Sequence, residues 1–447
     1  MNTRTKKPGA ERGSKANQTM TNRSIAPPIK QPVDFDVKLP PCNKHVLSNG
    51  VEVYSLDMGT EDTLMLNWVF YAGNWYEEKK MVASATNFLL KNGTTQKNAF
   101  QLNEHFEYYG AYLSRACYSE TSEITLHCLT KHTSELIPVV AEMISESVFP
   151  EEELAIYSQN ARQRLKVGLQ KNDFVAGRLI DAYLFGEKHP YGVYSNLEDY
   201  TGLTQADLVA FYNEFYKNGR CILFAAGKLP ADLISQLEQH FGKLPLHTHR
   251  KESKHIIHPI EPSPEKKHFV LNDPDGVQAA IRIVRPFPNR HHPDFQKVQV
   301  LNNVFGGFFG SRLSGNIRED KGYTYGIYSY LLNHIHESGW MISTEAGREV
   351  SDATIKEVYT EMELLRDELI DDEELQMIRN YMIGTVLGDL DGPFQVAGRW
   401  KSLLLNGLDE SYFYKGIEIA RSITAQELQE LANKYLKPEE FYELVVV

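Results

Sequence analysis

The chain has 447 residues, of which 42% are hydrophobic and 24% charged, which is typical of an ordinary globular protein with room for two or more domains. Its formal net charge of −12 argues against a nucleic-acid-binding protein, because nothing would offset the repulsion from phosphates. No apolar run reaches the length of a membrane span, since the longest candidates, such as Ile222 to Ala226, are the size of a strand.

The N-terminal segment, residues 1–32, is polar and basic and contains several Gly and Pro residues. It has no apolar core like that of a secretory signal, so we interpret it as a disordered tail and expect a cytoplasmic protein, with organelle targeting left open. The four cysteines have neither disulfide-framework nor zinc-knuckle spacing, and we expect them to be small buried residues: Cys42, Cys117, Cys128 and Cys221.

Residues 33–246 have the pattern of one α+β domain. Apolar periodicity predicts, in order, strands near 51–54 and 64–70, helices at 81–90 and 101–109, two strands within 112–129, helices at 134–147, 151–170, 174–185 and 205–216, and a strand at 221–226. Residues 247–267 are crowded with His, Lys, Glu and Pro, which is typical of a linker.

The order of elements repeats in residues 268–447, which we predict to be a second domain. Leu203–Phe224 aligns without gaps with Ile423–Leu444, at a constant offset of 220 residues. Both segments carry a Thr N-cap, an acidic partner for it, an apolar helix face and a final strand. A repeat of such a long period indicates domain duplication. The remaining predictions for this half are strands at 268–271, 277–284 and 340–344 and helices at 295–304, 352–368, 372–387, 394–406 and 425–435.

One glycine-rich stretch, Gly306–Tyr330, combines a short helix with a strand. Gly322 ends the helix that carries Arg318, and Tyr325 lies on the strand that follows. We therefore predict that the arginine and the tyrosine point into one space, where they suit a peptide carbonyl or a developing oxyanion. The alternative is that Arg318 lies on a solvated helix face and Tyr325 is packing.

Two motifs carry a resemblance to a known family. The pattern Arg-x-x-x-Gly-x-x-Tyr at Arg318, Gly322 and Tyr325, and the octapeptide FGEKHPYG at 185–192, resemble segments of the pitrilysin-like, or insulinase-like, metallopeptidases. The resemblance implies an α+β fold of two homologous domains, each a mostly antiparallel sheet with helices packed on one face. It also implies that Arg318 and Tyr325 help to hold substrate.

The helix at 81–90 is where active members of that family carry the zinc motif His-x-x-Glu-His. Counted back from Gly93, the two histidine positions fall on Ser84 and Phe88, and the glutamate position falls on Asn87. Serine is not a usual zinc ligand, phenylalanine cannot coordinate a metal, and asparagine cannot accept a proton. The three residues therefore form a degenerate motif, and we predict no zinc-type catalytic residue and no metal site in this chain.

Two further departures from the family agree with this interpretation. The later helix at 151–170 should supply a glutamate ligand, but Arg162, Arg164 and Lys166 stand near its expected place. The strand that resembles the peptide-binding edge of the family has Ser114-Arg115 where the family often has Asn-Ala. His189 fits a turn. The other clustered histidines predict no metal site either: His247, His249, His255, His258, His291, His292, His334 and His336.

The resemblance implies a non-catalytic, substrate-binding subunit of a heteromeric zinc peptidase. Its partners would be a peptide substrate and an active subunit. The active subunit, in a heterodimer or a dimer of heterodimers, would carry the zinc. Three alternatives stay open: a structural subunit like the core proteins of respiratory complexes, a stand-alone enzyme with an unrecognised metal site, and a chaperone-like module that binds peptides without cleaving them.

Overall fold

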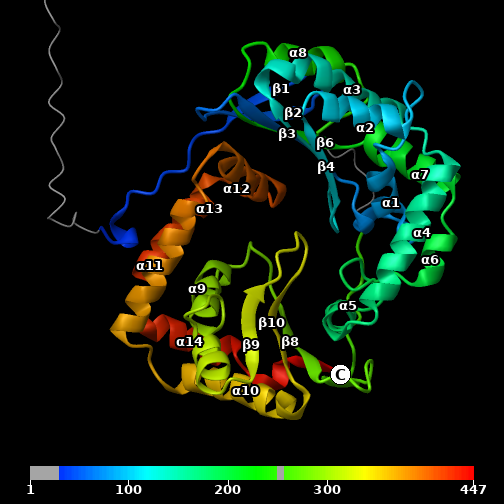
Figure 1. Cartoon of the computed structure of the whole chain (residues 1–447). Helices are drawn as coiled ribbons and strands as arrows, with labels where there is room; N and C mark the ends of the chain where they lie inside the picture. Colours follow the sequence, from blue (N-terminus) through cyan, green and yellow to red (C-terminus); the bar gives the residue numbers. More distant parts are fainter. Residues whose placement is uncertain (1–29, 249–255) are drawn as a thin grey trace, which may run out of the picture.

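The computed structural model describes residues 30–248 and 256–447, and two sheets divide this part of the chain into two halves (Figure 1). The predicted tail, up to residue 29, and the middle of the predicted linker lie outside the described residues. The first sheet has the order β1-β2-β6-β3-β5-β4, and β2 and β6 are its parallel pair. Its strands are β1 (Asn43–Val46), β2 (Glu52–Asp57), β3 (Thr63–Phe70), β4 (Tyr112–Cys117), β5 (Ser122–Leu129) and β6 (Cys221–Gly227).

The second sheet repeats the plan of the first. Its order is β7-β11-β8-β10-β9, and β7 and β11 are its parallel pair. The order therefore matches β2-β6-β3-β5-β4, which places β4 and β9 at equivalent edges. The predicted α+β fold of two homologous, mostly antiparallel halves is confirmed. The strands are β7 (Lys267–Val270), β8 (Gln278–Phe287), β9 (Thr324–Leu331), β10 (Ser338–Gly347) and β11 (Tyr442–Val446).

Most predicted helices are present with ends shifted by one or two residues, and three further helices, α6, α8 and α13, were not predicted. The first half contains α1 (Val82–Leu89), α2 (Ala99–Tyr108), α3 (Thr133–Glu146), α4 (Glu151–Gly168), α5 (Asn172–Phe185), α6 (Leu197–Thr201), α7 (Gln205–Tyr212) and α8 (Leu233–Phe241). The second contains α9 (Phe295–Phe305), α10 (Ser351–Asp367), α11 (Asp372–Gly388), α12 (Pro393–Leu405), α13 (Glu410–Ser422) and α14 (Ala425–Tyr435). No helix in the described part of the chain is both long and apolar enough to cross a membrane.

The internal repeat is visible in matching capping boxes. Thr204 accepts a hydrogen bond from the backbone N–H of Asp207 at the start of α7, and Thr424 accepts one from Glu427 at the start of α14, each at 3.2 Å. The carboxylates of Asp207 and Glu427 accept the threonine N–H groups in return, at 2.9 and 3.0 Å. The two N-termini are thus closed by the same reciprocal bonds at positions 220 residues apart in the sequence.

One helix of each half packs on the sheet of the other half. Successive residues of β6 point to opposite faces of their sheet, so Leu223 packs with the helices of its own half while Phe224 packs in a cluster with Leu404 and Leu405 at the end of α12. Conversely, Ile180 and Leu184 of α5 pack on the second sheet. This exchange covers the second face of both sheets, an arrangement that the sequence pattern did not predict. The sequence-based boundaries at 33–246 and 268–447 remain a prediction.

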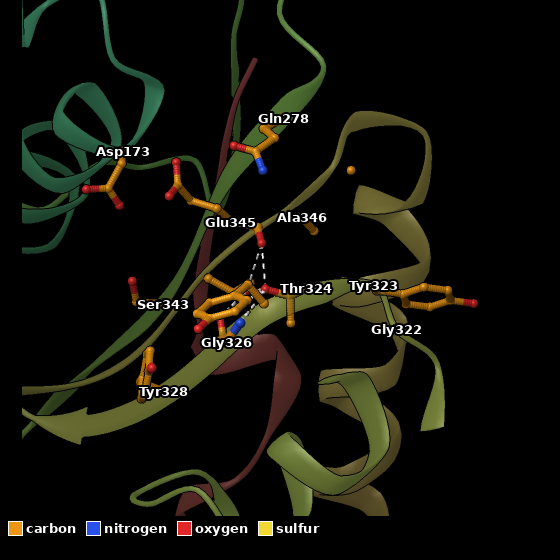
Figure 2. A pocket seen from close by; sticks show the side chains of 13 residues that line it. Asp173, Gln278, Gly322, Tyr323, Thr324, Gly326, Tyr328, Ser343, Glu345 and Ala346 are labelled. Atoms are coloured by element: carbon orange, nitrogen blue, oxygen red, sulfur yellow. Dashed lines mark hydrogen bonds between the residues drawn. The ribbon is translucent and has the colours of Figure 1, made fainter. Parts of the chain in front are cut away.

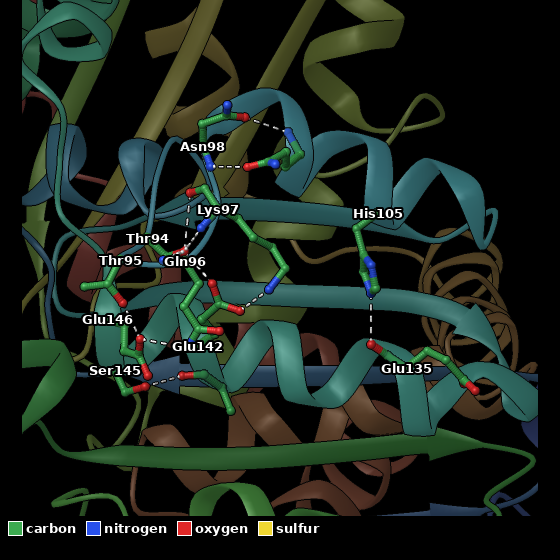
Figure 3. Close-up of polar contacts among 12 residues, drawn as sticks. Thr94, Thr95, Gln96, Lys97, Asn98, His105, Glu135, Glu142, Ser145 and Glu146 are labelled. Carbon is green, nitrogen blue, oxygen red and sulfur yellow. Dashed lines mark hydrogen bonds and ion pairs between the residues drawn. The ribbon is translucent and has the colours of Figure 1, made fainter.

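The turn that follows α1 is anchored to α3 (Figure 3). The hydroxyl of Thr94 and the ammonium of Lys97 both contact the buried carboxylate of Glu142, the latter at 2.5 Å. One step along, the hydroxyl of Thr95 donates to Glu146. These bonds tie the turn that follows α1 to α3.

Candidate functional site

The face of α1 that carries the predicted degenerate motif is closed by an aromatic contact. The hydroxyl of Ser84 donates to the carbonyl of Met81 at 3.2 Å and lies 3.4 Å from the hydroxyl of Tyr157 on α4. The ring of Phe88 packs against the ring of Tyr157, with centroids 5.1 Å apart. Where the family resemblance led us to look for two histidine ligands, the structure therefore has a hydroxyl and a phenyl ring.

A cation covers the same phenyl ring. Arg115, on the edge strand β4, holds its guanidinium carbon 4.9 Å from the centroid of the Phe88 ring and donates to the Phe88 carbonyl. Burial lowers the pKa of Arg115 to about 10, which leaves it charged at neutral pH. A fixed positive charge at this point opposes the binding of a metal cation.

Asn87 has become a core residue. Its side chain is 3% exposed, and its amide donates to the carbonyl of Glu123 at 3.3 Å and to the hydroxyl of Tyr216 at 3.1 Å. The amide thus links α1 to β5 and to the segment after α7. At the place where a general base would stand, the structure has a satisfied buried hydrogen-bond donor.

The remaining ligand position, on α4, was predicted to lie near Arg162, Arg164 and Lys166. Arg164 and Lys166 are exposed because the helix turns them to solvent, whereas Arg162 is half-buried, and the buried side of the helix includes Tyr157 and Leu165. The cation near α1 is Arg115 instead. Within residues 30–248 and 256–447, no three His, Cys, Asp or Glu side chains converge as metal ligands would. The donors around Ser84, Asn87 and Phe88 do not fit zinc.

A cavity of about 380 Å³ opens beside Ser84, between α1 and α5. Glu77 lines it, and burial raises the pKa of its carboxyl from an ordinary 4.5 to about 7. The carboxyl oxygens accept the backbone N–H groups of Met81 at 3.2 Å and Ala83 at 3.0 Å, so Glu77 caps the start of α1. Arg178 of α5 also lines this cavity.

The second predicted site differs because its side chains remain available. Arg318 lies on a short π-helix, η5 (Ser314–Asp320), and Tyr325 lies on the edge strand β9. The guanidinium carbon of Arg318 is 4.1 Å from the ring centroid of Phe309 and 5.8 Å from that of Tyr325. The structure therefore brings the predicted arginine and tyrosine side by side.

Neither side chain of this pair is fully used by the described residues. Tyr325 is 92% exposed, an unusual state for an aromatic side chain on a strand. The Nη1 atom of Arg318 is buried and has no hydrogen-bond partner within the described chain. A cation and a phenol with spare hydrogen bonds can together hold a carbonyl or an anionic oxygen.

A cavity of about 510 Å³ adjoins Tyr325 on the face of β9 and β10 (Figure 2). Figure 2 shows the side chain of Glu345 reaching toward Asp173 of α5 and Gln278 of β8. Sequence reasoning missed these three residues, because they come from three elements far apart in the chain and form no local motif. They bring carboxylate and amide groups to the wall of the same open space.

Buried bonds hold β9 in place beneath the exposed tyrosine. The hydroxyl of Thr344 donates to the hydroxyl of Thr324 at 2.8 Å and lies 2.9 Å from the carbonyl of Gly326. At the start of the stretch, a Cβ on Gly306 would lie 2.7 Å from the Cβ of Ser329, so this glycine is required by close packing against β9.

His189, predicted to fix a turn, is 1% exposed, and its Nδ1 accepts the backbone N–H of Tyr191 at 3.2 Å. The turn is thus stabilised by the side chain of the histidine. All four cysteines are free, and Cys128 and Cys221 are buried.

Sequence comparison relates the chain to peptidases. Residues 202–382 match the family model "Peptidase M16 inactive domain". A protein of Rickettsia felis described as an uncharacterized zinc protease is 22% identical over 409 residues, which are 89% of this chain and 90% of that protein. A probable mitochondrial-processing peptidase subunit beta of Schizosaccharomyces pombe is 23% identical over 283 residues, 60% of each chain.

Solved structures show the same fold. A peptidase M16 inactive domain from Pseudomonas fluorescens superimposes with a TM-score of 0.82 at 22% identity, covering 91% of this chain and 97% of that one. A protease from Helicobacter pylori also gives a TM-score of 0.82, at 16% identity, covering 92% of this chain and all, 100%, of the other. The comparisons support the predicted resemblance to the insulinase-like peptidase M16 family and to its non-catalytic type.

Proposed function

We propose that this chain is the non-catalytic, substrate-binding subunit of a two-chain zinc peptidase. A partner of the same fold carries the zinc and its general base, in a heterodimer or a dimer of heterodimers. This chain closes the peptide-binding space and holds the substrate with Arg318 and Tyr325. Catalysis by the pair then depends on both chains, whereas this chain alone cleaves nothing.

The observation that carries the proposal is the contrast between the two predicted sites. At α1, the chemical positions of a zinc peptidase are taken by Ser84, Asn87 and Phe88, and each makes contacts within the protein. At β9, Tyr325 is 92% exposed and Arg318 retains an unpartnered buried nitrogen. The exposed phenol of Tyr325 beside the cation of Arg318 is therefore available to a ligand.

The sheet edges supply a second reason. β4 and β9 each end a sheet, so their outer edges pair with no other strand of the described chain. An extended peptide can add to such an edge through main-chain hydrogen bonds. On β9 this places a substrate directly over Tyr325 and beside the cavity that Glu345 lines.

The proposal is tested by reconstitution. The purified chain, a relative from the same organism that carries His-x-x-Glu-His, and a mixture of the two are assayed for cleavage of a quenched fluorescent peptide, with bound zinc measured in each sample. We expect cleavage to be strongest in the mixture, with zinc in the partner and none in this chain. Size-exclusion chromatography checks that the two chains assemble.

Zinc-dependent cleavage by this chain alone would overturn the proposal, because the metal would then use ligands other than those at α1. Assembly without any gain in cleavage would favour the structural-subunit alternative. Peptide binding by the isolated chain, with no cleavage in any mixture, would favour the chaperone-like alternative.

A further inference from the structure

The two halves of the chain meet at a loop that belongs to the second half and docks on the first. This loop, residues 332–337, joins β9 to β10. The carboxylate of Glu120, in the turn between β4 and β5, accepts the backbone N–H of Ile335 at 2.9 Å. The hydroxyl of Tyr191 donates to the same carboxylate and accepts the backbone N–H of His336 at 3.1 Å. Two backbone bonds thus clasp the loop onto the first half.

Four histidines surround this clasp. Trp75, a buried residue just before α1, stacks on His336 with centroids 4.1 Å apart and meets the edge of His258 at 4.6 Å. His189 lies 5.6 Å from Trp75 and 6.0 Å from His258. His334 stacks on Tyr191 at 3.9 Å, the shortest ring distance in the cluster. The four come from the first half, the linker and the docked loop.

The surroundings suit neutral rings better than charged ones. Burial, reinforced by the three other histidines, lowers the pKa of His189 from an ordinary 6.5 to about 4. Burial also lowers the pKa of His334, and the carboxylate of Glu120 opposes this shift. Burial raises the pKa of Glu337, the acidic residue of the loop, so that group gives up part of its charge as the pH falls.

Other charged groups face the cluster only from the side of His258. They line two cavities next to that ring and come from the segment before α1, the turn after α5, and α7 with the π-turn after it: Glu77, Glu78, Lys79, Lys80, Glu187, Lys188, Asp207 and Glu214. Carboxylates outnumber ammonium groups there. A proton on His258 disfavours one on His189, its neighbour at 6.0 Å.

We propose that this histidine cluster is an acid-sensitive clasp between the two halves, and that protonation of His189 and His334 releases the 332–337 loop from the first half. A protonated His189 has no carboxylate partner in its buried place, so the protein relieves the charge by exposing the ring. The loop continues directly into β9 and β10. Its release therefore loosens the strand that carries Tyr325.

The direction with pH follows from proton linkage. Released histidines titrate near 6.5, whereas docked His189 titrates near 4, so the released state binds more protons between these values. The docked state is therefore favoured above pH 6.5 and is lost as the pH falls toward 4. Each such histidine raises the opening constant by at most about tenfold per pH unit.

The test is amide hydrogen exchange on the full chain between pH 7.5 and 5, expressed as protection factors so that the intrinsic pH dependence of exchange is removed. We expect protection of the Ile335 and His336 amides to fall about tenfold between pH 6 and 5. The amide of Ile342, in the middle of β10, should keep its protection. His291→Gln, at an exposed histidine, is the matched control and should show the same fall as the parent.

The double variant His189→Gln with His334→Phe removes both protons while keeping a ring on Tyr191, and it should show no fall. His258→Gln, at the half-buried rim of the cluster, is a milder variant that removes one of the neighbours that lower the pKa of His189, and it should reduce the fall. Protection that is independent of pH in the parent would overturn the proposal. An undiminished fall in the variants would also overturn it, since the titrating groups would then lie elsewhere.

Discussion

β4 and β9 stand at equivalent edges of two sheets with the same strand order, yet their surroundings have opposite character. On β4, Arg115 donates to the carbonyl of Phe88 and covers its ring. Beside β9, Arg318 also lies on a phenyl ring, that of Phe309, and stands next to a tyrosine that is almost fully exposed. Each arginine has one buried nitrogen without a partner among the described residues, so the exposed tyrosine marks the difference between the two edges.

The difference teaches how two equivalent edges of a duplicated fold can differ in what their side chains do. A helix is stable with any side chains that pack, and Asn87 is an example, since its amide is bonded within the core. Packing does not explain the pair Arg318 and Tyr325 in the same way, because exposed side chains contribute little to stability. What remains exposed at β9 is therefore the better guide to function.

The largest expected effect is on turnover by the reconstituted pair of chains. Tyr325→Phe removes only a hydroxyl, yet we expect it to lower kcat by roughly 10²–10³, the loss seen when one oxyanion donor is removed. Arg318→Ala should raise KM as well, because a charged hydrogen-bond donor is worth about 1.5–3 kcal/mol. Peptide cleavage kinetics measure both.

Matched controls come from exposed residues elsewhere. Tyr108→Phe, at a tyrosine of α2 that is 81% exposed, and Arg164→Ala, at an exposed arginine of α4, should leave the kinetics unchanged. Assembly, followed by size-exclusion chromatography, should be the same for all four variants. Parental kcat and KM in Tyr325→Phe and Arg318→Ala would remove the assignment of this pair.

The next effect is on stability and concerns Asn87, at the predicted general-base position. Asn87→Glu puts a carboxylate where the amide now donates two hydrogen bonds inside the core, and we expect it to lower the free energy of unfolding by about 2–4 kcal/mol at pH 8. Phe88→Glu is the control, since Phe88 is 41% exposed and Arg115 lies on its ring, so its cost should stay below about 1 kcal/mol. Urea unfolding checks both. Equal costs would mean that the α1 site is still open to water.

The sequence was sufficient where the signal was local. Apolar periodicity located most helices and strands, and the Thr204 and Thr424 caps revealed the duplication because a capping box occupies four consecutive residues. The adjacency of Arg318 and Tyr325 was also accessible, since a single helix-to-strand turn connects them. The function assigned to the pair remains a proposal.

The rest depended on contacts between distant residues. The sequence around Phe88 does not predict its contacts with Tyr157 and Arg115, which come from another helix and from an edge strand. The sequence also does not show that α4 turns Arg164 and Lys166 to solvent and keeps Arg162 half-buried, because distant contacts decide which side of the helix is buried. The exchange of α5 and α12 between halves also left no local pattern, since a helix with two apolar sides looks the same whichever sheet it covers.

A smaller effect on stability is expected from the carboxyl of Glu77, which caps α1. Its folded pKa of about 7 exceeds the ordinary 4.5, so the folded state binds more protons between these values, and the stability gained by protonation is lost as the pH rises through 7. Glu77→Gln keeps an oxygen for the N–H groups of Met81 and Ala83, and should be more stable than the parent by about 1–3 kcal/mol at pH 8 and nearly equal at pH 4.5. Thermal unfolding across this range measures it, with the exposed Glu78→Gln as the control. A variant less stable at pH 8 would show that the carboxylate is needed as a cap.

The smallest effect compares one threonine from each region. Thr344, under β9, donates its hydroxyl to Thr324 at 2.8 Å, whereas the hydroxyl of Thr86, on α1, is buried and has no hydrogen-bond partner in the described chain. Valine has nearly the same shape without the hydroxyl. Thr344→Val should therefore lower the free energy of unfolding by about 1–2 kcal/mol, and Thr86→Val should leave it unchanged or raise it by up to about 1 kcal/mol. Parallel urea titrations give the difference between the two variants. A loss of stability in Thr86→Val equal to that in Thr344→Val would mean that α1 uses this hydroxyl. The contrast between α1, stabilised here by packing, and β9, stabilised here by a hydrogen bond, would then be wrong.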